Sequence, residues 1–201
     1  MLKLICFYLL IIISWLNITA SAICFAQEKK IDGFDLQVRN WAGACKIEII
    51  SEFRKMFESN IISKAKLFDT FYIPVPNTDP QKYQTQYDKH TDKALQKILD
   101  NYLAKDNRLI FVAVVDINGY LPTHNSKYSK PLTGNREQDL MDSRTKRIFN
   151  DRTGLAAARN IQPFLIQRYS RDTGEEMVDL SVPIFINDRH WGAVRFGYKY
   201  K

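Results

Sequence analysis

Three short apolar runs in the second half of the chain constrain its fold more than any other feature. They cover residues 109–116, 178–186 and 190–198, and each is rich in β-branched or aromatic side chains. Apolar runs of this length, bounded by turn residues, are typical of strands buried in a sheet. The sequence therefore predicts that the second half of the chain is built around a sheet.

Turn residues between these runs predict how the strands connect. Asn118-Gly119 follows the first run, and this dipeptide favours a hairpin because both residues tolerate positive φ. Residues 187–189 reverse the chain between the last two runs, and residues 125–136 are rich in loop-forming residues. The sequence thus predicts a five-stranded antiparallel sheet, with strands at residues 109–116, 120–124, 164–171, 177–186 and 190–198.

The first half of the chain has the apolar spacing of helices. Apolar residues recur every three or four positions over residues 44–69 and again over 80–104, while Gly33 and Gly43 weaken the pattern further upstream. A short helix is also expected at residues 137–149, within the connector between the second and third strands. Because helices and strands are largely segregated along the chain, the predicted class is α+β.

The N-terminus has the pattern of a secretory signal peptide. An apolar run at residues 4–16 leads into a more polar stretch with small residues at Ala22 and Ala26, so residues 1–26 are expected to be removed at one of these two positions. The alternative is an uncleaved anchor, because residues 4–26 are long enough to cross a bilayer. The expected location is periplasmic or secreted, or inner-membrane anchored in the alternative case.

Composition and motifs exclude several classes of function. The net charge is +7, but the basic residues are scattered among acidic ones, and no nucleic-acid partner is expected. Cys45 is the only cysteine clearly in the body of the chain, and it is expected to be buried; no spacing suits zinc or haem. Nucleophile-elbow, P-loop and dinucleotide motifs are missing, so we expect a non-catalytic protein without metal or cofactor.

Several stretches of the chain resemble the PAS-like or Cache-like sensory region of bacterial methyl-accepting chemotaxis proteins. The resemblance covers about residues 60–198. The stretches that carry it are residues 67–76, 119–125, 144–160, 163–175 and 179–198.

This resemblance implies a fold and a broad role. The implied fold is a PAS/Cache-like five-stranded antiparallel sheet, with long N-terminal helices and a helical connector between strands 2 and 3. The organisation is then a leader at residues 1–26, an N-terminal helical segment at 27–76 and a sensory domain at 77–201. The implied function is an exported module that binds a small ligand. The heptad-patterned signalling hairpin of the receptors is missing, so a membrane-bound signalling protein is the expected partner.

Three arginines around the connector are candidates for holding an anion. Arg144 and Arg147 are three residues apart, on one face of the expected helix, and Arg159 follows it. A guanidinium binds two carboxylate or phosphate oxygens at once. The competing interpretation is ordinary surface charge, paired with nearby aspartates.

The strands carry polar and amphipathic side chains that are common in small-molecule pockets. An amino-acid-like ligand is one hypothesis, with an arginine at its carboxylate and Asp179 at its amine. The alternative is that Tyr169 and Trp191 simply pack in the core, while Asp179 is exposed or capped by Arg168 or Arg195. With the arginines, the candidate ligand-binding residues are Tyr120, His124, Arg144, Arg147, Arg159, Gln167, Tyr169, Asp179 and Trp191.

A second hypothesis for the function comes from a different class. The chain is then a non-catalytic periplasmic interaction protein with a filled core, and the helix at residues 44–69 is its docking or dimerisation surface. An exposed apolar stripe on that helix favours this hypothesis, whereas an unfilled polar region over the sheet favours sensing. A second copy of the chain is a further expected partner.

Overall fold

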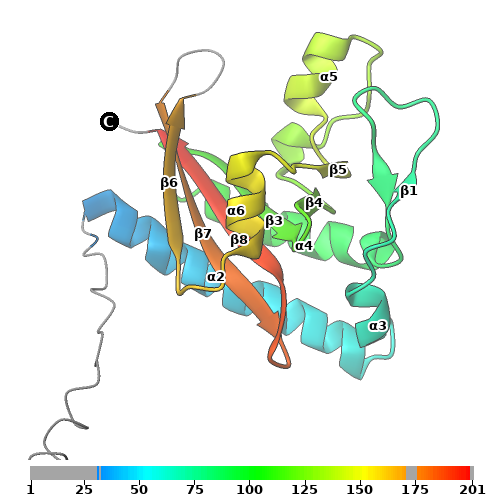
Figure 1. Cartoon of the computed structure of the whole chain (residues 1–201), viewed down its shortest axis with the longest axis horizontal. Coiled ribbons are helices and arrows are strands. Elements are labelled where there is room, and N and C mark those ends of the chain that lie inside the picture. Colours follow the sequence, from blue (N-terminus) through cyan, green and yellow to red (C-terminus); the bar gives the residue numbers. More distant parts are fainter. Residues whose placement is uncertain (1–30, 32, 171–175, 200–201) are drawn as a thin grey trace, which may run out of the picture. The chain divides into compact units, whose positions relative to one another are not determined.

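A computed structural model describes residue 31 and residues 33–170 and 176–199 of the chain. Residues from Asp32 to Lys201 form one compact unit (Figure 1). The signal peptide expected at residues 1–26 lies outside the described residues. Among the helices of the described part, none combines the length and the apolar character needed to cross a membrane.

The centre of the unit is a four-stranded antiparallel sheet in the order β3-β8-β7-β6. Its strands are β3 (Leu109–Asp116), β6 (Leu165–Ser170), β7 (Glu176–Ile186) and β8 (Arg189–Lys199). The first of these strands pairs with the last, and β7 and β8 form a long hairpin. The positive φ values of Asn187 (47°) and Asp188 (63°) match the tight turn predicted there. The α+β class with an antiparallel sheet is therefore confirmed.

The second expected strand, at residues 120–124, does not join this sheet. Only β4 (Tyr120–Leu121) is extended, and it pairs with β5 (Arg147–Ile148) in a separate two-stranded sheet. The side chain of Asp116 explains the difference, because its Oδ1 accepts the backbone N–H groups of Asn118 (2.9 Å) and Tyr120 (3.0 Å). These donors are thus engaged by a side chain instead of a neighbouring strand.

The helices before the sheet begin and end at other residues than the spacing predicts. The long helix α2 (Gly33–Glu58) begins well before residue 44 and ends before residue 69. Its buried positions recur every three or four residues, so packing along this face outweighs the low helix propensity of Gly43. The chain leaves the helix near Asn60, whose φ is 54°. The short helix α3 (Lys64–Leu67) follows separately.

The second helix, α4 (Asp88–Leu103), begins eight residues later than expected. The residues before it instead form β2 (Tyr83–Gln84), which pairs with β1 (Ile73–Pro74). The connector after β4 contains η1 (Ser126–Tyr128), α5 (Arg136–Asp142) and α6 (Arg152–Arg159). The helix expected at residues 137–149 therefore ends at Asp142, and the rest of that range is irregular apart from β5 at Arg147–Ile148.

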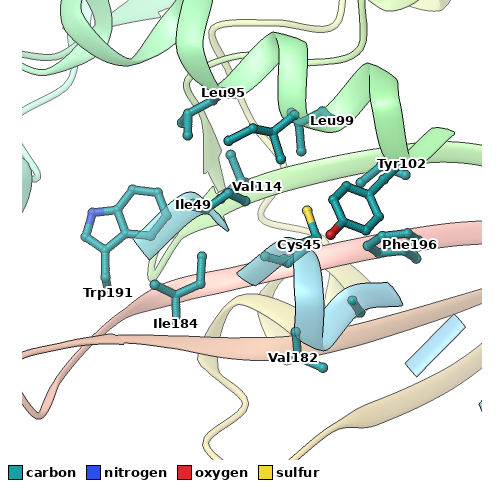
Figure 2. Packing of buried hydrophobic residues seen from close by; sticks show 14 of the residues in the cluster. Cys45, Ile49, Leu95, Leu99, Tyr102, Val114, Val182, Ile184, Trp191 and Phe196 are labelled. Atoms are coloured by element: carbon teal, nitrogen blue, oxygen red, sulfur yellow. The ribbon is translucent and has the colours of Figure 1, made fainter. Parts of the chain in front are cut away.

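The two faces of the sheet are covered differently. On one face α2 and α4 enclose a large apolar core, in which Cys45 is fully buried as expected (Figure 2). On the other face lies α6, over a much smaller cluster of mainly small residues (Figure 1). That cluster contains Ala113, Val115, Leu121, Ala158 and Ala193, with Phe111 and Phe149 packed against it.

Substitutions at two glycines test whether the close backbone contact between β3 and β8 stabilises the unit. A Cβ on Gly192 would lie 2.0 Å from the Val115 oxygen, whereas a Cβ on Gly43 meets nothing within 4 Å. We expect Gly192→Ala to lower the free energy of unfolding by about 2 kcal/mol or more, because β3 and β8 must separate. Gly43→Ala should raise it by roughly 0.5–1 kcal/mol. Urea unfolding of both variants measures this, and equal effects contradict the pairing of β3 with β8.

Candidate functional site

Polar side chains gather on the sheet face that lies under α6. Along β7, Val178, Leu180 and Val182 belong to the apolar core beneath α2, so the alternate residues Asp179 and Ser181 point to the opposite face. Strand pairing then sets Asp179 opposite Gln167 of β6, and Ser181 opposite Arg195 of β8. We call Gln167, Asp179, Ser181 and Arg195 the sheet-face cluster.

A buried ion pair forms the centre of the sheet-face cluster. Asp179 is fully buried and Arg195 is 8% exposed, and Oδ2 of Asp179 accepts hydrogen bonds from Nε (3.0 Å) and Nη2 of Arg195. Burial disfavours the charged guanidinium, but the Asp179 carboxylate outweighs this and raises the pKa of Arg195. The carboxylate that was expected to bind a ligand amine is therefore already neutralised by a neighbouring strand.

Two polar atoms of the cluster remain unpartnered. Oδ1 of Asp179 and Oγ of Ser181 are buried and have no hydrogen-bond partner among the described residues. Buried polar groups are nearly always paired, since an unpaired one costs roughly 1–3 kcal/mol. A small molecule with N–H or O–H groups would satisfy both atoms.

The connector brings Arg144 and Arg147 together, although not as expected. The two residues follow α5 and do not share a helix face. Nη1 of each donates to the Leu140 carbonyl oxygen at 3.3 Å, and each guanidinium carbon lies 5.0 Å from the centre of the Phe149 ring. Burial, with the nearby charges of Arg144 and Arg136, lowers the pKa of Arg147 to about 10.

His124 lies between the connector and the sheet. It is 3% exposed, its ring packs edge-on against Phe111 and tilted against Tyr128, and its Nδ1 accepts the backbone N–H of Asn125 at 2.7 Å. Burial lowers its pKa well below 6.5, and the charges of Arg144 and Arg195 lower it further. His124 is therefore neutral at pH 7 and close to both arginines.

Three other expected site residues also lie at the contact between connector and sheet. Gln167 donates to the Thr153 carbonyl oxygen of α6 at 3.0 Å, and Tyr169 is half-buried on the same strand, two residues further along. Arg159, at the end of α6, is exposed and donates to the Ile117 carbonyl oxygen at 3.4 Å. The connector is thus held to the sheet by a few hydrogen bonds.

Two of the expected residues lie elsewhere. Trp191 is buried in the apolar core, packs against Phe53 and donates from Nε1 to the Leu67 carbonyl oxygen at 2.9 Å (Figure 2). Tyr120 is buried as well, and its hydroxyl donates to Oδ2 of Asp88 at 2.7 Å. The structure therefore does not bring these two aromatic residues to the sheet-face cluster.

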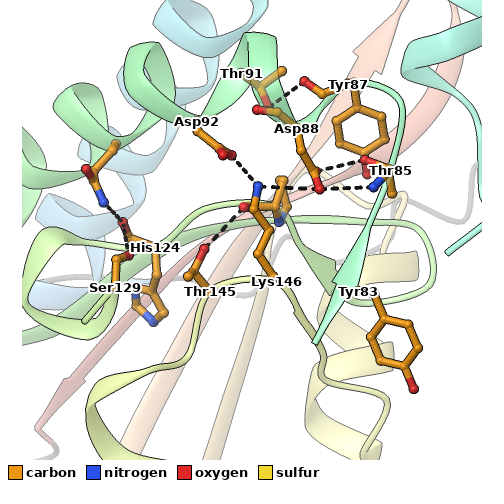
Figure 3. Close-up of polar contacts among 12 residues, drawn as sticks. Tyr83, Thr85, Tyr87, Asp88, Thr91, Asp92, His124, Ser129, Thr145 and Lys146 are labelled. Carbon is orange, nitrogen blue, oxygen red and sulfur yellow. Dashed lines mark hydrogen bonds and ion pairs between the residues drawn. The ribbon is translucent and has the colours of Figure 1, made fainter. Parts of the chain in front are cut away.

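A separate polar hollow of about 300 Å³ opens between α4 and the connector. At its edge, Lys146 Nζ lies between the carboxylates of Asp92 (2.5 Å) and Asp88 (3.4 Å), as Figure 3 shows. Gln96 closes another side by donating to the His124 carbonyl oxygen at 3.1 Å. The hollow is lined by Asp92, Lys93, Gln96, Thr123, Ser129, Thr145 and Lys146, none of which was among the expected site residues.

Sequence reasoning named Arg195 only in the alternative interpretation, as one of two arginines that could cap Asp179, and it gave no role to Lys82. Arg195 is the only charged residue between Trp191 and Tyr198 in an otherwise apolar strand, and this signal was available. Lys82 has no comparable signal, because it precedes a two-residue strand in a polar stretch.

Comparison with known proteins gives distant structural likenesses and no family. No protein-family model and no curated protein matches the chain. A solved extracellular ligand binding receptor from Desulfohalobium retbaense is similar with a TM-score of 0.39 and 12% sequence identity, over 79% of this chain and 24% of the receptor chain. The chain thus spans about a quarter of the length of that receptor.

Alanine substitutions at Ser143 and Ser181 compare a buried hydroxyl that has a hydrogen-bond partner with one that has none among the described residues. Ser143 Oγ donates to the Lys130 carbonyl oxygen at 2.6 Å, whereas Ser181 Oγ has no partner among the described residues. We expect Ser143→Ala to lower the free energy of unfolding by about 1 kcal/mol and Ser181→Ala to leave it unchanged or raise it. Chemical denaturation checks this, and a comparable loss in Ser181→Ala means that the hydroxyl has a partner.

The free energy of unfolding should fall as the pH is lowered, because His124 becomes protonated more readily in the unfolded chain than in the folded protein. Its pKa is lower in the folded state than the ordinary 6.5, so the unfolded chain binds more protons just below pH 6.5. Its contribution is fully present above pH 6.5 and is lost as pH falls toward the folded pKa. The free energy of unfolding should drop by up to about 1.4 kcal/mol per pH unit. His124→Asn keeps an acceptor for Asn125 and should flatten this slope between pH 7 and 5; an unchanged slope contradicts the assignment.

Proposed function

We propose that this protein is an exported, non-catalytic sensory module that binds a small ligand between the sheet and the connector at residues 125–162. The observation that carries the proposal is the pair of buried, unpartnered atoms on the sheet, Asp179 Oδ1 and Ser181 Oγ. They lie on the face that α6 covers, and a ligand is the partner that they lack.

The sheet-face cluster favours a ligand that donates hydrogen bonds. Asp179 offers one carboxylate oxygen and Ser181 a hydroxyl, while Arg195 is engaged with Asp179. An ammonium or amide group suits these atoms, since a charge-assisted hydrogen bond to a carboxylate is stronger than a neutral one. An amino-acid-like compound therefore remains the proposed ligand class, with Asp179 shared between its amine and Arg195.

A bound ligand changes the contacts by which the connector is held. Asn125 Oδ1 accepts the backbone N–H of Val112 at 2.8 Å, and Gln167 holds Thr153 at 3.0 Å. A ligand entering beneath α6 shifts these contacts. On the other face of β7 lies α2. A membrane-bound partner that contacts α2 can respond to its displacement. Such signalling requires that the ligand bind one arrangement more tightly than the other.

The PAS/Cache-like and chemotaxis-related character belongs to this same proposal. Its support is the antiparallel sheet with a long helix on one face and a helical connector between β4 and β6. The rival hypothesis, docking through the N-terminal helix, has less support. The large apolar side chains that α2 exposes are Leu36 and Ile47, two separate positions and no continuous stripe.

The test is a thermal-shift screen of the purified chain against amino acids, organic acids, purines, polyamines and divalent metals. A ligand at 100 times its Kd should add about 2.7 kcal/mol, which raises Tm by several degrees. Ser181→Ala should reduce this ligand-dependent shift. Ser143→Ala, which also removes a buried hydroxyl, should lower Tm but retain the shift.

Two results would count against the proposal. A well-folded chain without any hit favours the interaction protein. A hit whose shift survives Ser181→Ala unchanged places the ligand away from the sheet-face cluster.

A further inference from the structure

Three cationic side chains converge on one short segment of the connector, between α5 and Phe149. Lys82 Nζ donates to the carbonyl oxygens of Ser143 (3.2 Å) and Thr145 (2.8 Å), the two residues on either side of Arg144. Arg144 and Arg147 share the Leu140 carbonyl oxygen and the Phe149 ring. All three side chains are half-buried. We call Lys82, Arg144 and Arg147 the cation cluster.

Acidic side chains compensate the charges of Lys82 and Arg147 only in part. Neither Lys82 nor Arg147 forms an ion pair within the described part of the chain. The neighbouring Asp139 is engaged by the backbone N–H groups of Thr133 (2.8 Å) and Gly134 (3.0 Å) and by the Thr133 hydroxyl. Lys146, from the same segment, shows the contrast, because it pairs with both Asp88 and Asp92.

Like charges at such short range are unfavourable unless an anion joins them. Burial, with the charges of Arg147 and Lys146, lowers the pKa of Lys82 to about 8, and the Asp139 carboxylate opposes this only in part. The pKa of Arg147 is lowered in the same way. These shifts agree with the geometry: the fold keeps Lys82 and Arg147, both partly desolvated, close together, and neither has a salt bridge among the described residues.

We propose that the cation cluster binds a small doubly charged oxyanion, either inorganic or as the phosphate or sulfate group of a larger molecule. Arginine forks bind two oxygens of such a group at once, and lysine adds a compact charge. The positions of Arg144 and Arg147 in the chain already indicated an anion site. The structure adds Lys82 and the doubly charged class. This site does not rest on the sheet-face cluster and exists whether or not that cluster binds a ligand.

The first experiment compares sulfate and inorganic phosphate with chloride on the purified chain, at equal ionic strength, by thermal shift and calorimetry. Both oxyanions should raise Tm more than chloride does. Arg147→Gln should weaken sulfate binding at least ten-fold while melting at the same or a higher temperature in chloride, since it removes an uncompensated charge. Arg54→Gln, which removes an equally charged but exposed residue of α2, should bind sulfate like the unmodified chain.

The second experiment follows sulfate binding from pH 7 to 9, where sulfate keeps its double charge. The charged groups that face Lys82 are Arg147, Lys146 and Asp139. Because only the protonated Lys82 binds the anion, the affinity should fall about ten-fold over this range. Lys82→Gln should bind more weakly at pH 7 and show a flatter dependence. This slope is a property that a merely structural Lys82 lacks.

Several outcomes overturn the proposal. Oxyanions that stabilise the chain no more than chloride exclude the site, and an equal loss in Arg54→Gln and Arg147→Gln reduces the effect to net charge. If sulfate binds, a comparison of inorganic phosphate with a phosphorylated sugar distinguishes the two sources: tighter binding of the sugar phosphate identifies the group of a larger molecule. Loss of oxyanion binding leaves the test with Ser181→Ala unaffected, so the two proposals fail separately.

Discussion

The pairing of β3 with β8 determines how the rest of the unit is arranged. These are the first and last strands of the sheet along the chain, yet they are hydrogen-bonded neighbours. The chain between β3 and β6 must therefore pass over one face of the sheet before it returns at the far edge. The helices α2 and α4 fill the other face with apolar side chains, so the connector face is where polar groups can be held. Gly192 makes the close approach of the two strands feasible.

Small residues on β8 create the space for that polar face. Gly197 carries no side chain, and the Phe111 ring lies where its Cβ would be, 2.0 Å from the nearest ring atom. An aromatic ring laid over a glycine of the adjacent strand covers backbone that is otherwise bare. Between Ala193 and Gly197, the long side chain of Arg195 extends across to Asp179 without crowding. The ion pair can therefore form because Ala193 and Gly197, the neighbours of Arg195 on this face of β8, are small.

The sequence was sufficient for the strands and insufficient for several of the contacts that shape the site. The runs at residues 109–116, 177–186 and 190–198 were predictable because β-branched residues and turn residues act locally. The loss of β4 from the sheet was not, because it depends on Asp116 capturing two backbone N–H groups, a choice that only the folded geometry reveals. Likewise Arg144 and Arg147 meet through Leu140 and Phe149, and no helix period encodes that meeting.

Whether a buried charge is paired distinguishes the charged side chains that stabilise the fold from those that are available for binding. The buried charges of Asp179 and Arg195 neutralise each other, and Lys146 is matched by two carboxylates, so the fold itself accounts for most of their cost. Lys82 and Arg147 are partly desolvated and form no salt bridge in the described part of the chain, although Asp139 faces Lys82. Their contacts with backbone carbonyl oxygens and Phe149 hold them in place, but keeping two such cations close together costs stability in the absence of an anion. Binding is therefore to be sought at these two cations and, separately, at Asp179 Oδ1 and Ser181 Oγ, which lack partners among the described residues.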